Sequence, residues 1–279
     1  MNRITSVCTA SSARRWIGLA VSLLVLSGLW SCSTQPGAYG KSSGQADLIT
    51  DSDEPENRKR ARIRMELAVG YFEQGQTRIA LDEVKLALLA DPLFADAHNL
   101  RGLVYMRMNE LPLAQDSFQR SLALDPKNMN VVHNLGWLQC QQARFVQAVE
   151  SFGRALADPT YTGRAKTWLT QGLCQMRAGE LSQAESSLSR SYELDPGNPI
   201  TGYNLSQLLY RRGELVRAQF QVQRINNSEL ANAESLWLGI KVERRLQNLV
   251  VVQQLVDQLK KRFPQSAELI AYERGQFDD

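Results

Sequence analysis

Apolar and polar residues repeat along this chain with a period of 34 residues, from residue 59 to its end. The clearest recurring pattern is an apolar run closed by Asp-Pro, which ends at residues 92, 126, 159 and 196. With the first unit starting at residue 61, the next four start at 95, 129, 165 and 199, and two extra residues precede the fourth. A sixth, degenerate unit runs from Ala233 to Pro264. A fixed period of this length indicates stacked copies of one small structural unit.

Each unit is predicted to be a pair of antiparallel helices, A and B. Small residues at repeat positions 8 and 20 would let the two backbones approach closely. Position 8 holds Ala68, Gly102, Gly136, Gly172 and Ser206, and position 20 holds Ala80, Ala114, Ala148, Ala184 and Ala218. Larger residues at position 24 are expected to fill the gap between neighbouring repeats. They are Val84, Phe118, Phe152, Leu188 and Val222.

Helix ends are marked by Pro, Gly and Asn. Proline cannot donate a backbone hydrogen bond and disfavours helical geometry in the residue before it, so the recurring Asp-Pro is expected to end helix B. Gly75, Asn109, Gly179 and Gly213 fall where helix A turns into helix B. We expect left-handed backbone there, which costs Gly little and Asn tolerably little.

This pattern resembles the tetratricopeptide (TPR) repeat. The resemblance implies an all-α fold over residues 59–279, a superhelical solenoid of about six helix-turn-helix repeats. An unrelated helical bundle is the alternative, but a bundle has no reason for a 34-residue period.

Residues 1–31 are typical of an export signal. Arg14 and Arg15 precede an apolar run over residues 16–30. That run is shorter than the roughly 20 residues that a membrane-spanning helix needs, which favours a signal over the alternative of a single-pass anchor.

Residues 29–32, Leu-Trp-Ser-Cys, resemble a bacterial lipobox. The resemblance implies cleavage before Cys32, covalent lipid on its thiol and acylation of the new amino terminus, and hence stable membrane attachment. Ser33 follows, where an Asp would imply retention at the inner membrane, so we expect the periplasmic face of the outer membrane. Residues 32–58 are rich in Ser, Gly, Asp and Pro, a composition typical of a flexible linker.

Cys140 and Cys174 are the cysteines that fall within the repeats. Two thiols are too few to staple a domain of this size, and the sequence alone gives no Cβ geometry to support a bond between them. We therefore expect unpaired thiols rather than a disulfide.

The charge distribution argues against a nucleic-acid partner. The 32 Lys and Arg include three in residues 1–31, so 29 remain in the processed chain, equal to its 29 Asp and Glu. Binding to a phosphate backbone requires a cationic surplus. Catalytic motifs are also missing, and His98 and His133 are more typical of structural histidines than of a metal site. We therefore expect no enzyme activity, no metal and no cofactor beyond the lipid on Cys32.

A protein partner is then expected on the concave face, which helix A lines in TPR proteins at positions such as 5, 9 and 12. An apolar stripe there would suit an amphipathic helix or an extended peptide. The candidate partner-binding residues are Met65, Val69, Phe72, Asn99, Leu103, Met106, His133, Trp137, Cys140 and Leu173. The fifth repeat presents Tyr203, Gln207, Tyr210 and Arg211 instead, a more polar surface.

The lipobox, the linker and about six repeats together resemble the type IV pilus biogenesis lipoproteins, the PilF/PilW pilotins. The segments that carry this resemblance include residues 97–126 and 134–152. It implies a protein that binds a secretin subunit, carries it to the outer membrane by its lipid and promotes its multimerisation. Two alternatives stay open: a lipid-anchored periplasmic adaptor for cell-wall enzymes, and a component of outer-membrane protein assembly.

Overall fold

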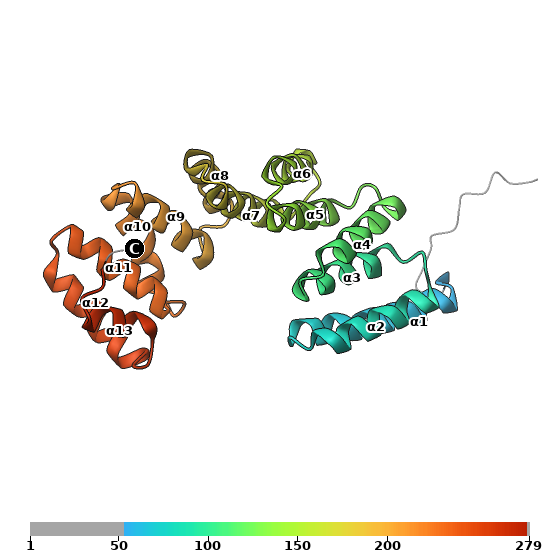
Figure 1. Cartoon of the computed structure of the whole chain (residues 1–279), viewed down its shortest axis with the longest axis horizontal. Coiled ribbons are helices and arrows are strands. Elements are labelled where there is room, and N and C mark those ends of the chain that lie inside the picture. The colour runs from blue at the N-terminus through green and yellow to red at the C-terminus, as the bar shows by residue number, and fades with distance from the viewer. Residues whose placement is uncertain (1–52, 278–279) are drawn as a thin grey trace, which may run out of the picture. The chain divides into compact units, whose positions relative to one another are not determined.

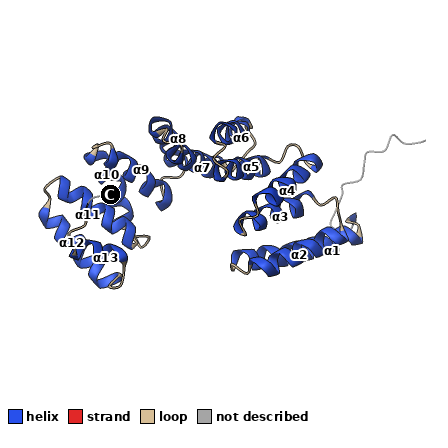
Figure 2. Cartoon of the chain, in the orientation of Figure 1, coloured by secondary structure: helices blue, strands red, loops and turns tan. Residues whose placement is uncertain are grey.

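The computed structural model describes residues 53–277, all within one compact unit, Ile49–Asp279. The expected signal peptide, Cys32 and most of the linker lie outside the described residues. Over residues 53–277 the secondary structure is entirely helical (Figure 2). The helices are α1 (Glu56–Glu73), α2 (Thr77–Ala90), α3 (Ala95–Arg107), α4 (Leu111–Leu124), α5 (Met129–Gln141), α6 (Phe145–Ala157), α7 (Arg164–Arg177), α8 (Leu181–Leu194), α9 (Pro199–Arg211), α10 (Leu215–Asn226), α11 (Ala233–Arg245), α12 (Leu249–Arg262) and α13 (Ala267–Glu273).

The helices pair in the order that the repeats predict, from α1 with α2 to α11 with α12, and each pair packs against the next (Figure 1). The all-α TPR solenoid expected from the sequence is therefore confirmed. Helix α1 begins at Glu56, so its first three residues lie within the stretch predicted as linker. At the other end, the short α13 packs against α11 and α12. None of the helices within residues 53–277 is long and apolar enough to cross a membrane.

The small residues at position 8 are explained by contacts within each repeat. A Cβ added to Gly102 would lie 2.4 Å from the ring of Phe118, and one added to Gly136 would lie 2.8 Å from the ring of Phe152. The position-24 side chain thus packs directly against helix A of its own repeat. Phe118 also shares a buried cluster with Val131 of the next repeat. The expectation that position 24 fills only the gap between repeats was therefore incomplete.

The turns between helices A and B have left-handed backbone at one residue each. Gly75, Asn109, Gly179 and Gly213 have φ values of 76°, 61°, 79° and 79°, as expected. Ala143 and Gln247 take the same role in the third and sixth repeats, with φ values of 57° and 63°. Left-handed geometry costs such residues roughly 1–2 kcal/mol. The solenoid imposes this turn even where the sequence does not favour it.

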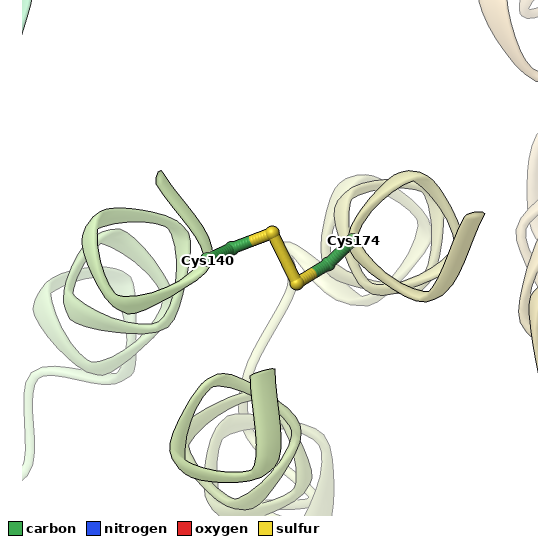
Figure 3. Close-up of a disulfide and its surroundings, with 2 residues drawn as sticks. All are labelled: Cys140 and Cys174. Carbon is green, nitrogen blue, oxygen red and sulfur yellow. A yellow bond between two sulfur atoms is a disulfide. The ribbon is translucent and has the colours of Figure 1, made fainter. Parts of the chain in front are cut away.

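Cys140 and Cys174 form a disulfide between α5 and α7, which corrects the expectation of unpaired thiols (Figure 3). Their Cα atoms are 5.8 Å apart, within the range that a disulfide requires. Both side chains are fully buried, and Ala148 and Phe152 pack around them. The bond covalently joins helix A of the third repeat to helix A of the fourth.

Candidate functional site

Three of the ten predicted groove residues offer a partner no surface. Met106, His133 and Cys140 are buried, with 9%, 4% and 0% of their surface exposed. Met106 packs against the third repeat, and Cys140 is consumed by the disulfide. Placing these three in the groove was wrong, because their side chains pack within and between repeats. The other seven are half-buried: Met65, Val69, Phe72, Asn99, Leu103, Trp137 and Leu173.

His133 is a core histidine. Its Nδ1 lies 2.8 Å from Thr167 Oγ1, which in turn lies 2.8 Å from the hydroxyl of Tyr161. Burial lowers the pKa of His133 to about 4, with a smaller contribution from Lys166, so the ring is neutral at physiological pH. Burial also lowers the pKa of His98, although its Nε2 lies 2.9 Å from the Pro92 carbonyl. The described part of the chain holds no cluster of three potential metal ligands.

The six apolar members of these seven half-buried residues pack against the buried clusters of their repeats. Met65, Val69, Phe72 and Leu103 pack against the core of the first two repeats. The guanidinium of Arg107 lies 3.5 Å from the ring centroid of Phe72. Asn99 accepts a hydrogen bond of 2.9 Å from Asn134. This row is therefore partly covered by its own side chains and exposes less apolar surface than the sequence suggested.

Helix α1 carries more exposed apolar side chains than this row. Ile63 and Leu67, at repeat positions 3 and 7, are 49% and 44% exposed. In the later repeats, position 3 is 1% exposed or less. Those equivalent residues are Ala97, Val131, Thr167, Thr201 and Ser235. Position 3 is buried there because each helix A packs against helix B of the preceding repeat. Within residues 53–277 no helix precedes α1, so its apolar face is uncovered.

This face forms an open groove of about 400 Å³, here named the α1 groove. Ile63, Leu67, Gly70 and Tyr71 form its apolar lining, and Glu66 and Gln74 line the rest. Apart from its chain neighbours and the adjacent backbone of α1, no heavy atom would come within 4 Å of a Cβ added to Gly70, so the missing side chain leaves the floor of the groove open.

Helix α2 extends the apolar surface beside the α1 groove. Ile79 and Leu86, 45% and 41% exposed, lie two turns apart on a face that also carries Glu83. The carboxylate of Glu83 pairs with Arg64 of α1 at 3.0 Å, which places this face next to α1. Leu86 stands where the next four repeats have an arginine: Arg120, Arg154, Arg190 and Arg224. The first repeat is therefore apolar at a position that is charged in the repeats that follow.

The geometry of the first repeat suits an added helix. An amphipathic helix in the α1 groove would bury Ile63 and Leu67 as a preceding helix B would, and Glu66 and Arg62 would remain at the margin, paired at 2.9 Å. Sequence reasoning missed this surface because it assigned partner binding to the concave positions alone. The signal was present: Ile63 occupies a position that a preceding helix covers in the later repeats, and the segment before α1 has a linker composition.

Two family models described as "Tetratricopeptide repeat" match residues 95–128 and 133–199. Over 249 residues, the chain is 28% identical to the type IV pilus assembly protein PilF of Pseudomonas aeruginosa, covering 89% of this chain and 95% of PilF.

The fold is also similar to two solved structures. One is PilW, described as a widely conserved type IV pilus biogenesis factor, with a TM-score of 0.69 and 29% identity. The match covers 76% of this chain and 98% of PilW. The other is Pseudomonas aeruginosa PilF, with a TM-score of 0.69 and 26% identity over 80% of this chain and all of PilF.

Proposed function

We propose that this chain, a TPR protein related to the type IV pilus biogenesis proteins PilF and PilW, is a lipid-anchored scaffold that binds a secretin subunit. The relatives support a role in pilus biogenesis. The secretin subunit, a protein that must reach the outer membrane and multimerise there, is the partner that the lipobox and repeats together suggest. The protein acts by binding and carries out no chemical step.

The observation that carries the proposal is the α1 groove. Ile63 is 49% exposed at a position that is buried in all five later repeats, and Leu67, 44% exposed, lies one helical turn along the same face. Burying an apolar side chain of this size stabilises a complex by about 1.5–3 kcal/mol when burial is complete. An amphipathic segment of the secretin that docks as an additional helix would gain part of this free energy by burying Ile63 and part by burying Leu67.

The anchor part of the proposal depends on Cys32 and on the compartment. A structural disulfide such as Cys140–Cys174 persists in oxidising compartments such as the periplasm, and this supports export. Cys32→Ser should release the protein from the membrane and leave the repeats folded. Membrane fractionation with radiolabelled palmitate measures this, and label on the variant would contradict the lipobox assignment.

Calorimetric titration of the repeats with the secretin subunit tests the binding site. The double variant Ile63→Glu, Leu67→Glu places two carboxylates in the α1 groove and should weaken binding by at least about 2 kcal/mol, the scale of an interface hot spot. The matched control is Leu194→Glu, because Leu194 is 53% exposed on α8, away from the first repeat.

Trp137→Ala separately tests the half-buried residues predicted to line the concave face. Loss of affinity in this variant, with unchanged affinity in the α1 variant, would return the site to the concave face. Unchanged affinity in both variants would contradict both placements. If a pull-down from detergent-solubilised membranes recovered cell-wall enzymes and no secretin, it would contradict the proposed partner.

A further inference from the structure

The edge of the solenoid where helix A turns into helix B changes character in the last two repeats. The turn segments are residues 211–217, between α9 and α10, and residues 244–250, between α11 and α12. Together they contain five arginines and one glutamate. Residues 73–79, the segment of the first repeat that matches residues 211–217, contain one arginine and one glutamate, against three arginines and one glutamate in residues 211–217. Positive charge is therefore concentrated toward the C-terminal end of this edge.

The two turn segments lie side by side and form one surface. Arg245 donates a hydrogen bond of 3.3 Å to the backbone carbonyl of Tyr210, one residue before the first segment. The guanidinium of Arg245 lies 4.9 Å from the ring centroid of Tyr210. Helix α11 also packs against both α9 and α10. We name this surface, residues 211–217 with 244–250, the C-terminal turn edge.

The same edge exposes aliphatic side chains. Val216 is 70% exposed at the start of α10, and Leu249 and Val250 are 69% and 74% exposed at the start of α12. Phe220, one helical turn beyond Val216, is 57% exposed. Four large apolar side chains therefore stand among arginines on the surface of two consecutive repeats.

Some of the positive charge of this edge is not neutralised. Arg212 and Arg217 pair with Glu214 and with Glu185 of α8. Counting these two glutamates and Glu243, whose carboxylate accepts a hydrogen bond of 2.7 Å from Asn248, five arginines face three carboxylates. Arg244 instead lies over the ring of Phe277, with its guanidinium 3.6 Å from the ring centroid. The last turn of α12 is also basic, with Lys260, Lys261 and Arg262, so the exposed apolar residues beside the arginines are what distinguish the C-terminal turn edge.

We propose that the C-terminal turn edge docks on an anionic phospholipid surface. Guanidinium groups bind headgroup phosphates at the membrane interface, and neighbouring aliphatic side chains enter the boundary of the acyl region. An acidic protein is the alternative occupant, and the polyglutamate arm of the experiment below separates it from a bilayer. The proposal goes beyond partner binding, and it depends on the proposed lipid anchor only to bring this edge close to a bilayer.

Vesicle co-sedimentation of residues 49–279 tests the edge without the anchor. This fragment is the compact unit that holds every described helix. The vesicles are phosphatidylcholine alone and phosphatidylcholine with 30% phosphatidylglycerol, in low salt. Binding is expected to the anionic vesicles only and to weaken as salt rises. Each basic residue near an anionic surface contributes about 1 kcal/mol, or about fivefold in the partition coefficient.

The variants separate the edge from general cationic attraction. Arg211→Glu should lower the partition coefficient at least fivefold, and Val216→Ser with Val250→Ser should lower it further. The charge-matched control is Lys260→Glu, because Lys260 is exposed near the C-terminal end of α12, the opposite edge of the same repeat. The apolar control is Val146→Ser, which removes a 74% exposed valine from the third repeat.

An equal loss of vesicle binding in the edge variants and in the two controls would overturn the proposal, as would equal binding of the wild type to both kinds of vesicle. Absence of vesicle binding with retention on immobilised polyglutamate would also overturn it and would assign the edge to an acidic protein. Because the fragment lacks Cys32 and no secretin is present, these outcomes are independent of the proposed function.

Discussion

Removal of the Cys140–Cys174 disulfide should cost the folded protein several kcal/mol. The bond joins residues 34 apart in sequence. In the chain-entropy description, closing a loop of that length lowers the entropy of the unfolded chain enough to stabilise the native state by about 4 kcal/mol. The double variant Cys140→Ala, Cys174→Ala loses this stabilisation. It also loses part of the packing around two fully buried sulfur atoms.

Urea unfolding of residues 49–279, followed by circular dichroism, measures the difference. The free energy of unfolding of the oxidised wild type should exceed that of the double variant by about 3–5 kcal/mol, the loop term plus or minus repacking. Adding reductant to the denaturant should lower the wild type to the level of the variant and leave the variant unchanged. In the native protein the buried bond should react slowly with reductant, because the sulfur atoms must first be uncovered.

The refuting result is equal stability of oxidised wild type and double variant, with a free-thiol assay confirming that the wild type is oxidised. That result would mean that the third and fourth repeats are already fixed relative to one another in the unfolded ensemble, or that the bond distorts the native stack by as much as it stabilises it.

Three further predictions concern stability and are read from urea unfolding. Ala143→Gly should stabilise the protein by about 1 kcal/mol, because Gly adopts the φ of 57° without the steric cost of a Cβ; lower stability would contradict the turn geometry. Gly102→Ala should destabilise the protein by about 1–3 kcal/mol, because the new methyl group meets the buried ring of Phe118. Gly153→Ala in α6, with open space around it, should instead stabilise the protein by up to about 1 kcal/mol. Equal effects of the two variants would contradict the packing. Burial lowers the pKa of His133 to about 4, against 6.5 in the unfolded chain. The stability that depends on the neutral ring is complete above pH 6.5 and falls by about 3 kcal/mol as the pH drops toward 4. His133→Gln should lose less stability over that interval, and identical pH profiles of the two proteins would contradict the burial.

Much of the fold follows from local chemistry that the sequence displays. Pairing of the two helices within each repeat follows from the 34-residue period and from the small residues opposite Phe118 and Phe152. The turn glycines mark where helix A turns into helix B. Ala143 and Gln247 were not predictable as left-handed residues, because neither side chain favours that geometry. There the neighbouring helices dictate the turn, and the residue adapts.

The disulfide shows where residue-by-residue register fails. By repeat numbering, Cys140 occupies position 12 and Cys174 position 10, so the pair does not look equivalent. The two residues inserted before the fourth repeat cause this offset. Position 10 is fully buried in the second to sixth repeats, as Val104, Leu138, Cys174, Leu208 and Val242 show. Which face of α7 meets α5 depends on interhelical geometry that the spacing of cysteines does not encode.

The candidate site was only partly predictable for a related reason. Burial of Met106 and His133 depends on contacts with neighbouring helices, which a position number does not describe. Exposure of Ile63 depends on the helix that α1 lacks among the described residues. A partner surface in a repeat protein is thus defined as much by missing neighbours as by the residues present.

The unequal ends of the solenoid give it a direction. The α1 end presents a face that a further helix can continue, whereas α13 closes the other end and turns Glu273 and Arg274 outward. Within residues 53–277, a helix added in line with the repeats can therefore continue the stack at the α1 end, whereas α13 already packs against α11 and α12 at the other end. On the proposed function, a secretin helix docked in the α1 groove would extend the solenoid by one element at that end alone.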